Sequence, residues 1–201
     1  MRRAPISIFL SVIFIFFYSN CRSLPSYDAQ LSLGKNSSKL KTSKYVVFPF
    51  EFAEGLELTD SQENSQKIVS GRNREKTEKA LFQAGFTVLE RGKLDKLINE
   101  ITLSKTGITE SEGLNLGKIV NANCAVFGKI TNYSVARRRL RKHFVAEIIL
   151  KGVDIETGVI LWESSLKGHT PFTNGQQTLL DTENRLYEKF VKKLQENMGN
   201  Q

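Results

Sequence analysis

The chain has 201 residues, enough for one domain with a substantial hydrophobic core and hardly enough for two. Its 40% apolar and 25% charged residues are ordinary for a globular protein and exclude a wholly disordered chain. The formal net charge is +8, and only two cysteines, Cys21 and Cys124, are present.

The first twenty residues have the layout of an export signal. Arg2 and Arg3 form a positive start, and residues 6–18 form an apolar run shorter than the ~20 residues of a comfortable membrane span. Cys21 follows at the place of the acylated cysteine of a bacterial lipoprotein, although the residues before it match the usual box only loosely. We therefore predict a signal peptide over residues 1–20 and lipidation at Cys21. An ordinary cleaved signal or an uncleaved anchor is the alternative.

After signal removal the predicted mature chain stays basic. Arg2 and Arg3 are lost, which leaves 27 Lys and Arg against 21 acidic residues, a net charge of about +6. Residues 22–43 are rich in Ser, Lys and Leu without a sustained period, so we expect a flexible tether before a domain over residues 44–201. Cys124 lies in an apolar run and is predicted to be a small buried side chain rather than a redox group.

The domain begins with an apolar run over residues 44–51, which predicts a strand buried on both faces. Pro49 has no amide hydrogen to donate, so strand pairing is expected to end or shift there. Residues 53–73 are polar and predict a long loop. A first helix is expected over residues 74–84, with Gly85 as its C-terminal cap.

The middle of the chain predicts two further helices between two strands. A second strand is expected over residues 86–89, followed by a helix over residues 93–103 with apolar residues at helical spacing. Another helix is expected to begin at Thr109, since Thr109 and Glu112 fit a capping box. A third strand is predicted over residues 124–130.

The last part predicts a hairpin followed by a long helix. Strands are expected over residues 144–154 and 159–166, joined by a turn in which Gly158 comes late. The last helix is expected over residues 176–198. The order β-α-β-α-α-β-β-β-α predicts a single α/β (α+β) domain, a mixed sheet of about five strands flanked by helices.

Residues suited to catalysis are scarce. The only histidines, His143 and His169, have neither a cysteine nor another histidine at metal-ligand spacing. We therefore predict no catalytic, cofactor or metal site and no small-molecule substrate. A hydrolase that acts on wall polymers is the enzymatic alternative.

The densest charge is a basic run of five cations, for which a contact with an anionic surface is one interpretation; its members are Arg137, Arg138, Arg139, Arg141 and Lys142. Such residues bind anionic lipid headgroups, an envelope polymer or an acidic partner. The alternative is a solvated hairpin tip. Export and the lack of interleaved aromatic residues argue against nucleic acid.

Several segments, in order, resemble the curli production assembly/transport component family (CsgG-like proteins). The resemblance covers about residues 44–168 and is carried by YVVFPFE (45–51), FTVLERGKLDKLINE (86–100), TGI (106–108), LGKIVNANC (116–124), FGKI (127–130) and VDIETGVILW (153–162). It implies an α/β domain similar to the amino-terminal domain of TolB and to the penicillin-binding-protein activator LpoB, all envelope proteins that work by binding or assembly. It also implies that Glu90 and Arg91 form a structural corner rather than a catalytic pair.

These observations predict a non-enzymatic lipoprotein of the outer membrane, with its domain facing the periplasm; exposure at the cell surface is the alternative. Its expected role is that of an adaptor or assembly factor, with an envelope protein or further copies of itself as partner. The alternative is a subunit of an oligomeric curli-type secretion channel, and less favoured roles are a cell-wall hydrolase and a penicillin-binding-protein activator. Residues 131–143 are too short and too cationic for the long alternating hairpin strands of such a channel, so the sequence favours the soluble domain.

Overall fold

The computed structural model describes residues 24–35, 40–56, 66–102, 109–138, 141–173 and 178–199. The signal peptide expected over residues 1–20 and Cys21 lie outside these residues. The described strands are β1 (Ser26–Leu33), β2 (Lys44–Val47), β3 (Glu51–Phe52), β4 (Thr87–Val88), β5 (Cys124–Arg138), β6 (Arg141–Asp154) and β7 (Ile160–Thr173). The described helices are α2 (Gln66–Gln83), α3 (Gly92–Thr102), α4 (Glu110–Ile119) and α5 (Leu179–Gly199).

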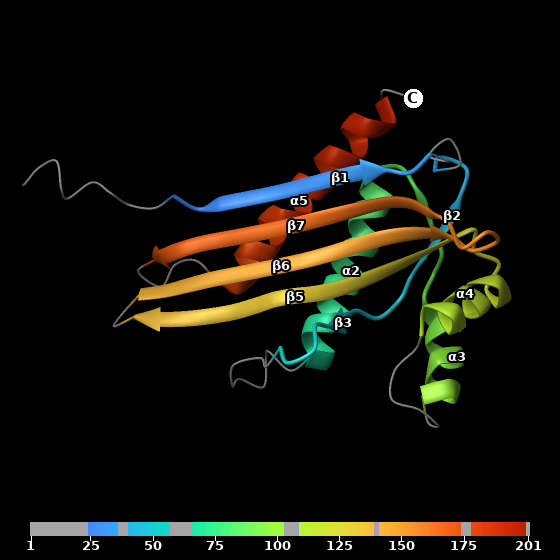
Figure 1. Cartoon of the computed structure of the whole chain (residues 1–201), viewed down its shortest axis with the longest axis horizontal. Coiled ribbons are helices and arrows are strands. Elements are labelled where there is room, and N and C mark those ends of the chain that lie inside the picture. The colour runs from blue at the N-terminus through green and yellow to red at the C-terminus, as the bar shows by residue number, and fades with distance from the viewer. Residues whose placement is uncertain are drawn as a thin grey trace, which may run out of the picture.

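All described strands belong to one mixed sheet (Figure 1). Its order is β1-β7-β6-β5-β2-β4, with β3 pairing to β5 beside this path. The short strands β2 and β3 run parallel to β5, whereas β5, β6, β7 and β1 are antiparallel neighbours. The predicted α/β domain with a mixed sheet and flanking helices is confirmed, with seven strands in place of about five.

Pro49 divides the first apolar run as expected. β2 ends at Val47, β3 begins at Glu51, and both pair with β5. Tyr45, Val46 and Val47 are each at most 1% exposed, so the prediction of a strand buried on both faces is confirmed.

The expectation of a flexible tether over residues 22–43 is wrong for Ser26–Leu33, which forms the edge strand β1. This strand pairs antiparallel with β7 from Ser26 opposite His169 to Leu33 opposite Trp162. Its apolar side chains alternate with polar ones, and Ala29 is 3% exposed in the core. The alternation of polar and apolar residues over 26–33 is the sequence signal of a half-buried strand. Amino-acid composition does not depend on the order of the residues, so it cannot show this alternation.

The expectation of a loop over residues 53–73 is wrong from Gln66 onward, because α2 begins eight residues before the predicted start at residue 74. The first half of α2 buries polar side chains, among them Ser70 and Asn73. A helix is recognised in a sequence by the spacing of its apolar residues. The first half of α2 is buried through polar side chains, so this spacing is absent there.

The three long strands also extend further than expected. β5 has 15 residues, and β6 and β7 have 14 each. The third strand therefore continues past residue 130 into the basic run, and β6 begins at Arg141 in place of residue 144. The register of the β5–β6 ladder shifts at a bulge between Ile130 and Asn132, and the pairing continues beyond it to Arg138 opposite Arg141.

Two helical layers cover the sheet unequally. On one face α2 and α5 pack against a large core that includes Leu81, Trp162 and Phe190. On the other face α3 and α4 cover only the β2 end, around Phe48 and Leu94. The rest of this second face, on β5, β6, β7 and β1, extends away from α3 and α4, and we call it the open face (Figure 1).

The predictions that depended on a cap or a turn are confirmed. Thr109 and Glu112 form the capping box of α4. Gly85 and Gly158 take positive φ angles of 92° and 70° after α2 and in the β6–β7 turn. Cys124 is fully buried, and this burial raises the pKa of its thiol. Among the helices that the structure describes, none combines the length and the apolar character needed to cross a bilayer.

Candidate binding surface

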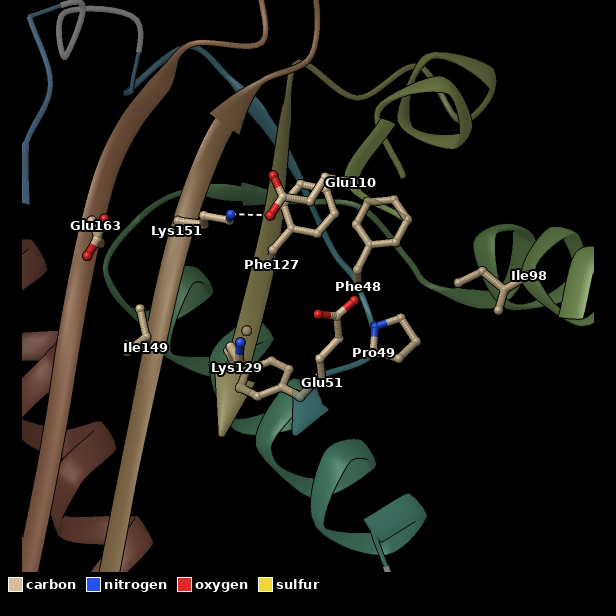
Figure 2. A pocket seen from close by; sticks show the side chains of 12 residues that line it. Phe48, Pro49, Glu51, Ile98, Glu110, Phe127, Lys129, Ile149, Lys151 and Glu163 are labelled. Carbon is tan, nitrogen blue, oxygen red and sulfur yellow. Dashed lines mark hydrogen bonds and ion pairs between the residues drawn. The ribbon is translucent and has the colours of Figure 1, made fainter. Parts of the chain in front are cut away.

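A groove lies at the step where the α3–α4 layer ends and the open face begins. It has a volume of about 560 Å³. Its lining residues come from the β2–β3 segment, both helices and three neighbouring strands: Phe48, Pro49, Phe50, Glu51, Ile98, Glu110, Phe127, Gly128, Lys129, Ile149, Lys151 and Glu163. Figure 2 shows this arrangement, with the rings of Phe48 and Phe127 side by side.

The floor of the groove is apolar and closely packed. Phe48 and Phe127 are stacked with ring centroids 5.1 Å apart and an interplanar angle of 13°. A Cβ at Gly113 of α4 would stand 2.7 Å from the Phe127 ring, so glycine is what lets the helix approach this close. Ile149 is 36% exposed on the adjoining strand and extends the apolar floor onto the open face.

The rim of the groove carries charges of both signs. Lys151 of β6 forms an ion pair with Glu110 of α4 (Figure 2). In the strand register, Lys151 faces Glu163 of β7, and Glu51 of β3 faces Lys129 of β5. An apolar floor with a rim of mixed charge suits a protein segment that inserts an apolar side chain and pairs its flanking charges. Among the described residues that line the groove there is no histidine, cysteine or serine.

The open face continues the mixed charge beyond the groove. Glu147 of β6 faces Lys167 of β7, which in turn faces Asp28 of β1. Opposite charges across neighbouring strands favour this register and keep the face polar. The face is therefore a wide charged surface with one apolar depression at its edge. Sequence reasoning missed it, although alternation along β5 and β6 marks which side chains share a face.

A second polar cluster lies in the core between α2, α5 and β5, and we call it the Glu183 cluster. Glu183 is fully buried and pairs with Arg72 and Lys76, each at 2.9 Å. The Tyr133 hydroxyl donates to Glu183 Oε1 at 2.5 Å, and Asn73 Nδ2 donates to the same oxygen at 3.2 Å. Sequence reasoning missed this cluster, because its members are up to 111 residues apart and no local pattern connects them.

The two cations hold Glu183 ionised despite its burial. Burial by itself raises the pKa of this carboxyl, but Lys76, Arg72 and Tyr133 together outweigh it and place the pKa below the ordinary value. The same burial, with the adjacent Glu183 charge, raises the pKa of the Tyr133 phenol, so Tyr133 stays protonated and can donate. The arrangement is a closed, satisfied network that joins two helices to the sheet.

The structural corner expected at Glu90 and Arg91 is present, but each of these residues contacts a different partner. The Glu90 carboxylate accepts a hydrogen bond from the Gly92 amide at 2.9 Å, at the start of α3. Arg91 instead lies 3.7 Å from Glu78 of α2. Arg74 joins the same corner through Asp95 at 2.5 Å. These contacts tie α2 to α3, which agrees with a structural corner.

The two histidines, far apart in sequence, lie side by side. The rings of His143 on β6 and His169 on β7 have centroids 4.3 Å apart in an edge-to-face arrangement. Burial lowers the pKa of His143, and the neighbouring His169 lowers it further. No group of three His, Cys, Asp or Glu residues able to hold a metal occurs in the described part of the chain.

The basic run sits at the far end of the long strands from α3 and α4. The backbones of Arg137 and Arg138 end β5, and those of Arg141 and Lys142 begin β6. Arg137 faces Lys142 and Arg138 faces Arg141 in the ladder. Arg139 lies outside the described residues. The run therefore does not contribute to the groove.

Comparisons with known proteins place these features in context. The family model described as "Curli production assembly/transport component CsgG" matches residues 78–143, from α2 to the start of β6, so this part of the chain is similar to that family. The expected resemblance is confirmed over this segment. No curated protein sequence matches the chain.

Solved structures share the fold at low sequence identity. The PelC dodecamer from Paraburkholderia phytofirmans matches with a TM-score of 0.55 and 12% identity over 85% of this chain and 98% of that one. Lipoprotein GNA1162 from Neisseria meningitidis matches with a TM-score of 0.53 and 15% identity over 79% of this chain and 99% of that one. The LpoB C-terminal domain from Escherichia coli is more distant, with a TM-score of 0.37, 15% identity and coverages of 67% and 92%. The first two likenesses show the fold alone, which is also the fold of a protein described as a dodecamer and of one described as a lipoprotein.

Proposed function

We propose that this chain is a lipid-anchored protein of the bacterial outer membrane that works by binding, as an adaptor in envelope assembly or secretion, and not as an enzyme. The groove beside the open face carries this proposal, because it offers an apolar floor and a charged rim to a protein partner. A second copy of the chain is the first candidate partner, since the PelC structure with the same fold is a dodecamer. The anchor is proposed from Cys21 and its preceding signal, supported by the fold shared with a lipoprotein.

Replacing the anchor cysteine tests the membrane attachment. Cys21→Ala removes the thiol that acylation requires, and we expect the protein to move from the membrane fraction to the soluble fraction of the envelope. Metabolic labelling with a fatty acid is expected to mark the unmodified chain and not the variant. Cys124→Ala is the matched control, since that thiol is fully buried. Retention of unlabelled Cys21→Ala in the membrane would contradict the anchor.

Site-specific photo-crosslinking tests the binding surface. A photo-reactive amino acid at Ile149, in the groove, is expected to give a discrete adduct in intact envelope membranes. The same residue at Lys192, on the opposite helical layer and with a 73% exposed side chain, is expected to give none. An adduct of twice the chain mass identifies a second copy, and mass spectrometry identifies any other partner. Identical patterns at the two positions, or no adduct at Ile149, would refute a docking role for the groove.

A further inference from the structure

We propose that the end of the sheet where β5 meets β6 is a docking site for anionic phospholipid headgroups. The site, which we call the basic tip, is formed by Arg137, Arg138, Arg141 and Lys142. The inference deepens the proposed function, because it assumes that Cys21 carries the anchor. It assigns an orientation to the domain, with its long strands pointing their β5–β6 end at the membrane.

The strand register brings the anchor and the basic tip to one end of the sheet. The start of β1, the end of β7, the start of β6 and the end of β5 lie together, because each strand is antiparallel to the next (Figure 1). Ser26 at the start of β1 faces His169, and Thr173 at the end of β7 faces Lys142. The chain therefore enters the domain from the side on which the basic tip lies.

The distances match along the strand direction. β7 continues four residues from His169 to Thr173, so the basic tip projects about 13 Å beyond Ser26 at ~3.3 Å per residue. Cys21 precedes Ser26 by five residues, which span at most about 17 Å. An acyl chain on Cys21 can thus enter the bilayer while the basic tip meets the same surface.

This end of the sheet carries positive charge alone in its strand segments. Residues 132–146 and 164–173 contain no Asp or Glu, and neither do residues 22–27 before and at the start of β1. The nearest acids on these strands are Glu147 of β6 and Asp28 of β1, both set back from the tip. Each Lys or Arg near an anionic membrane surface contributes about 1 kcal/mol, so four together give strong preference for anionic over neutral lipid.

A vesicle-binding experiment separates the tip from the anchor. The chain from residue 21 onward, which contains every described element, is used with Cys21→Ala so that no acyl chain contributes. Sedimentation with vesicles of phosphatidylcholine containing 30% phosphatidylglycerol is compared with pure phosphatidylcholine, at roughly 0.1 M salt, where charges are screened over ~10 Å. We expect binding to the anionic vesicles only. The four-fold variant Arg137→Gln, Arg138→Gln, Arg141→Gln, Lys142→Gln is expected to bind them at least about 100-fold more weakly.

The control removes the same charge elsewhere. The control variant carries four substitutions at exposed positions of α2 and α5, which lower the net charge by the same amount: Lys79→Gln, Lys189→Gln, Lys192→Gln and Lys193→Gln. This variant should keep its binding to the anionic vesicles.

Two results with the vesicles would overturn the proposal. Equal loss of binding in both variants would show that net charge alone acts, and unchanged binding of the tip variant would show that the tip makes no contact. Tighter binding of the tip to an acidic peptide or an oligonucleotide than to the vesicles would overturn it as well. Thermal unfolding of both variants verifies that they are folded. Because no acyl chain is present, the outcome is independent of the Cys21 fractionation result.

Discussion

Glu183→Ala is expected to lower the free energy of unfolding by about 2–3 kcal/mol, because it leaves two partly buried cations, Arg72 and Lys76, without the fully buried carboxylate that they share. Arg72 and Lys76 lose their 2.9 Å partners, and the Tyr133 hydroxyl loses its acceptor. Equilibrium denaturation with urea, followed by tryptophan fluorescence, measures the loss. The loss is large because the buried Tyr133 hydroxyl and the partly buried Arg72 and Lys76 all lose the same acceptor group.

Three companion variants separate the charge from the side-chain volume. Glu188→Ala on the same helix, at an exposed position, should change stability by less than ~0.5 kcal/mol. Glu183→Gln keeps the shape and one acceptor oxygen, so its loss should be smaller than that of Glu183→Ala. Combining Glu183→Leu with Arg72→Met and Lys76→Met should recover much of the stability, since no buried charge then remains. If Glu183→Ala and Glu188→Ala lose the same amount, the cluster does not stabilise the fold.

The same carboxylate predicts how stability depends on pH. The pKa of Glu183 is lower in the folded chain than its ordinary value of 4.5, so the unfolded chain binds the proton more readily. The contribution of Glu183 is therefore complete above about pH 4.5 and is lost as the pH falls through this value and below it. Denaturation midpoints measured between pH 7 and pH 3 should fall more steeply for the unmodified chain than for Glu183→Gln.

Gly152→Ala is expected to destabilise the core by about 1–3 kcal/mol or more through overpacking. Gly152 of β6 faces Trp162 of β7, and a Cβ at this position would stand 2.1 Å from the indole Nε1. The indole cannot yield easily, because it is 1% exposed and packs on Phe190 at a ring distance of 5.9 Å. Thermal and urea unfolding measure the loss.

Replacing a glycine that has open space around it is expected to raise stability, in contrast to Gly152→Ala. No atom lies within 4 Å of a Cβ at Gly71 in α2, so Gly71→Ala should raise stability by about 0.5–1 kcal/mol through helix propensity.

A double-mutant cycle tests whether the loss in Gly152→Ala comes from the clash with the Trp162 indole. In a Trp162→Phe background the five-membered ring that meets the new methyl group is gone, so Gly152→Ala should cost less there. An equal cost in both backgrounds would place the origin of the loss in the backbone rather than in the indole.

Local interactions made part of the fold predictable. The capping box at Thr109 and the glycine at 158 depend on neighbours within a few residues, and their geometry follows from residue type. The helical stripe of α5 was visible because Leu186, Phe190 and Leu194 all face one apolar core. Each of these patterns involves only residues of one segment. The helices and the central strands could therefore be predicted without knowing what packs against them.

Elements that depend on distant partners were missed or cut short. β1 is a strand because β7 offers it a free edge, and Ser26 and His169 are more than 140 residues apart. Polar residues in the first half of α2 are buried against distant partners, Asn73 against Glu183 and Ser70 against the backbone of Phe50. β5 continues through Ser134 into the basic run because β6 pairs with it, not because its residues alternate cleanly. Hydrogen bonds and ion pairs between distant segments override weak local preference.

By itself the sequence predicted an export-type start, and it determined the order of most helices and strands, the mixed α/β sheet and the family resemblance that residues 78–143 share. Only the tertiary structure decided where the groove lies, how Glu183 is satisfied, and that the basic tip and the start of β1 share one end of the sheet. The physical reason is the range of the interactions. Caps, turns and apolar periods act between near neighbours, whereas a binding surface is formed by strands and helices that the chain brings together only when it folds.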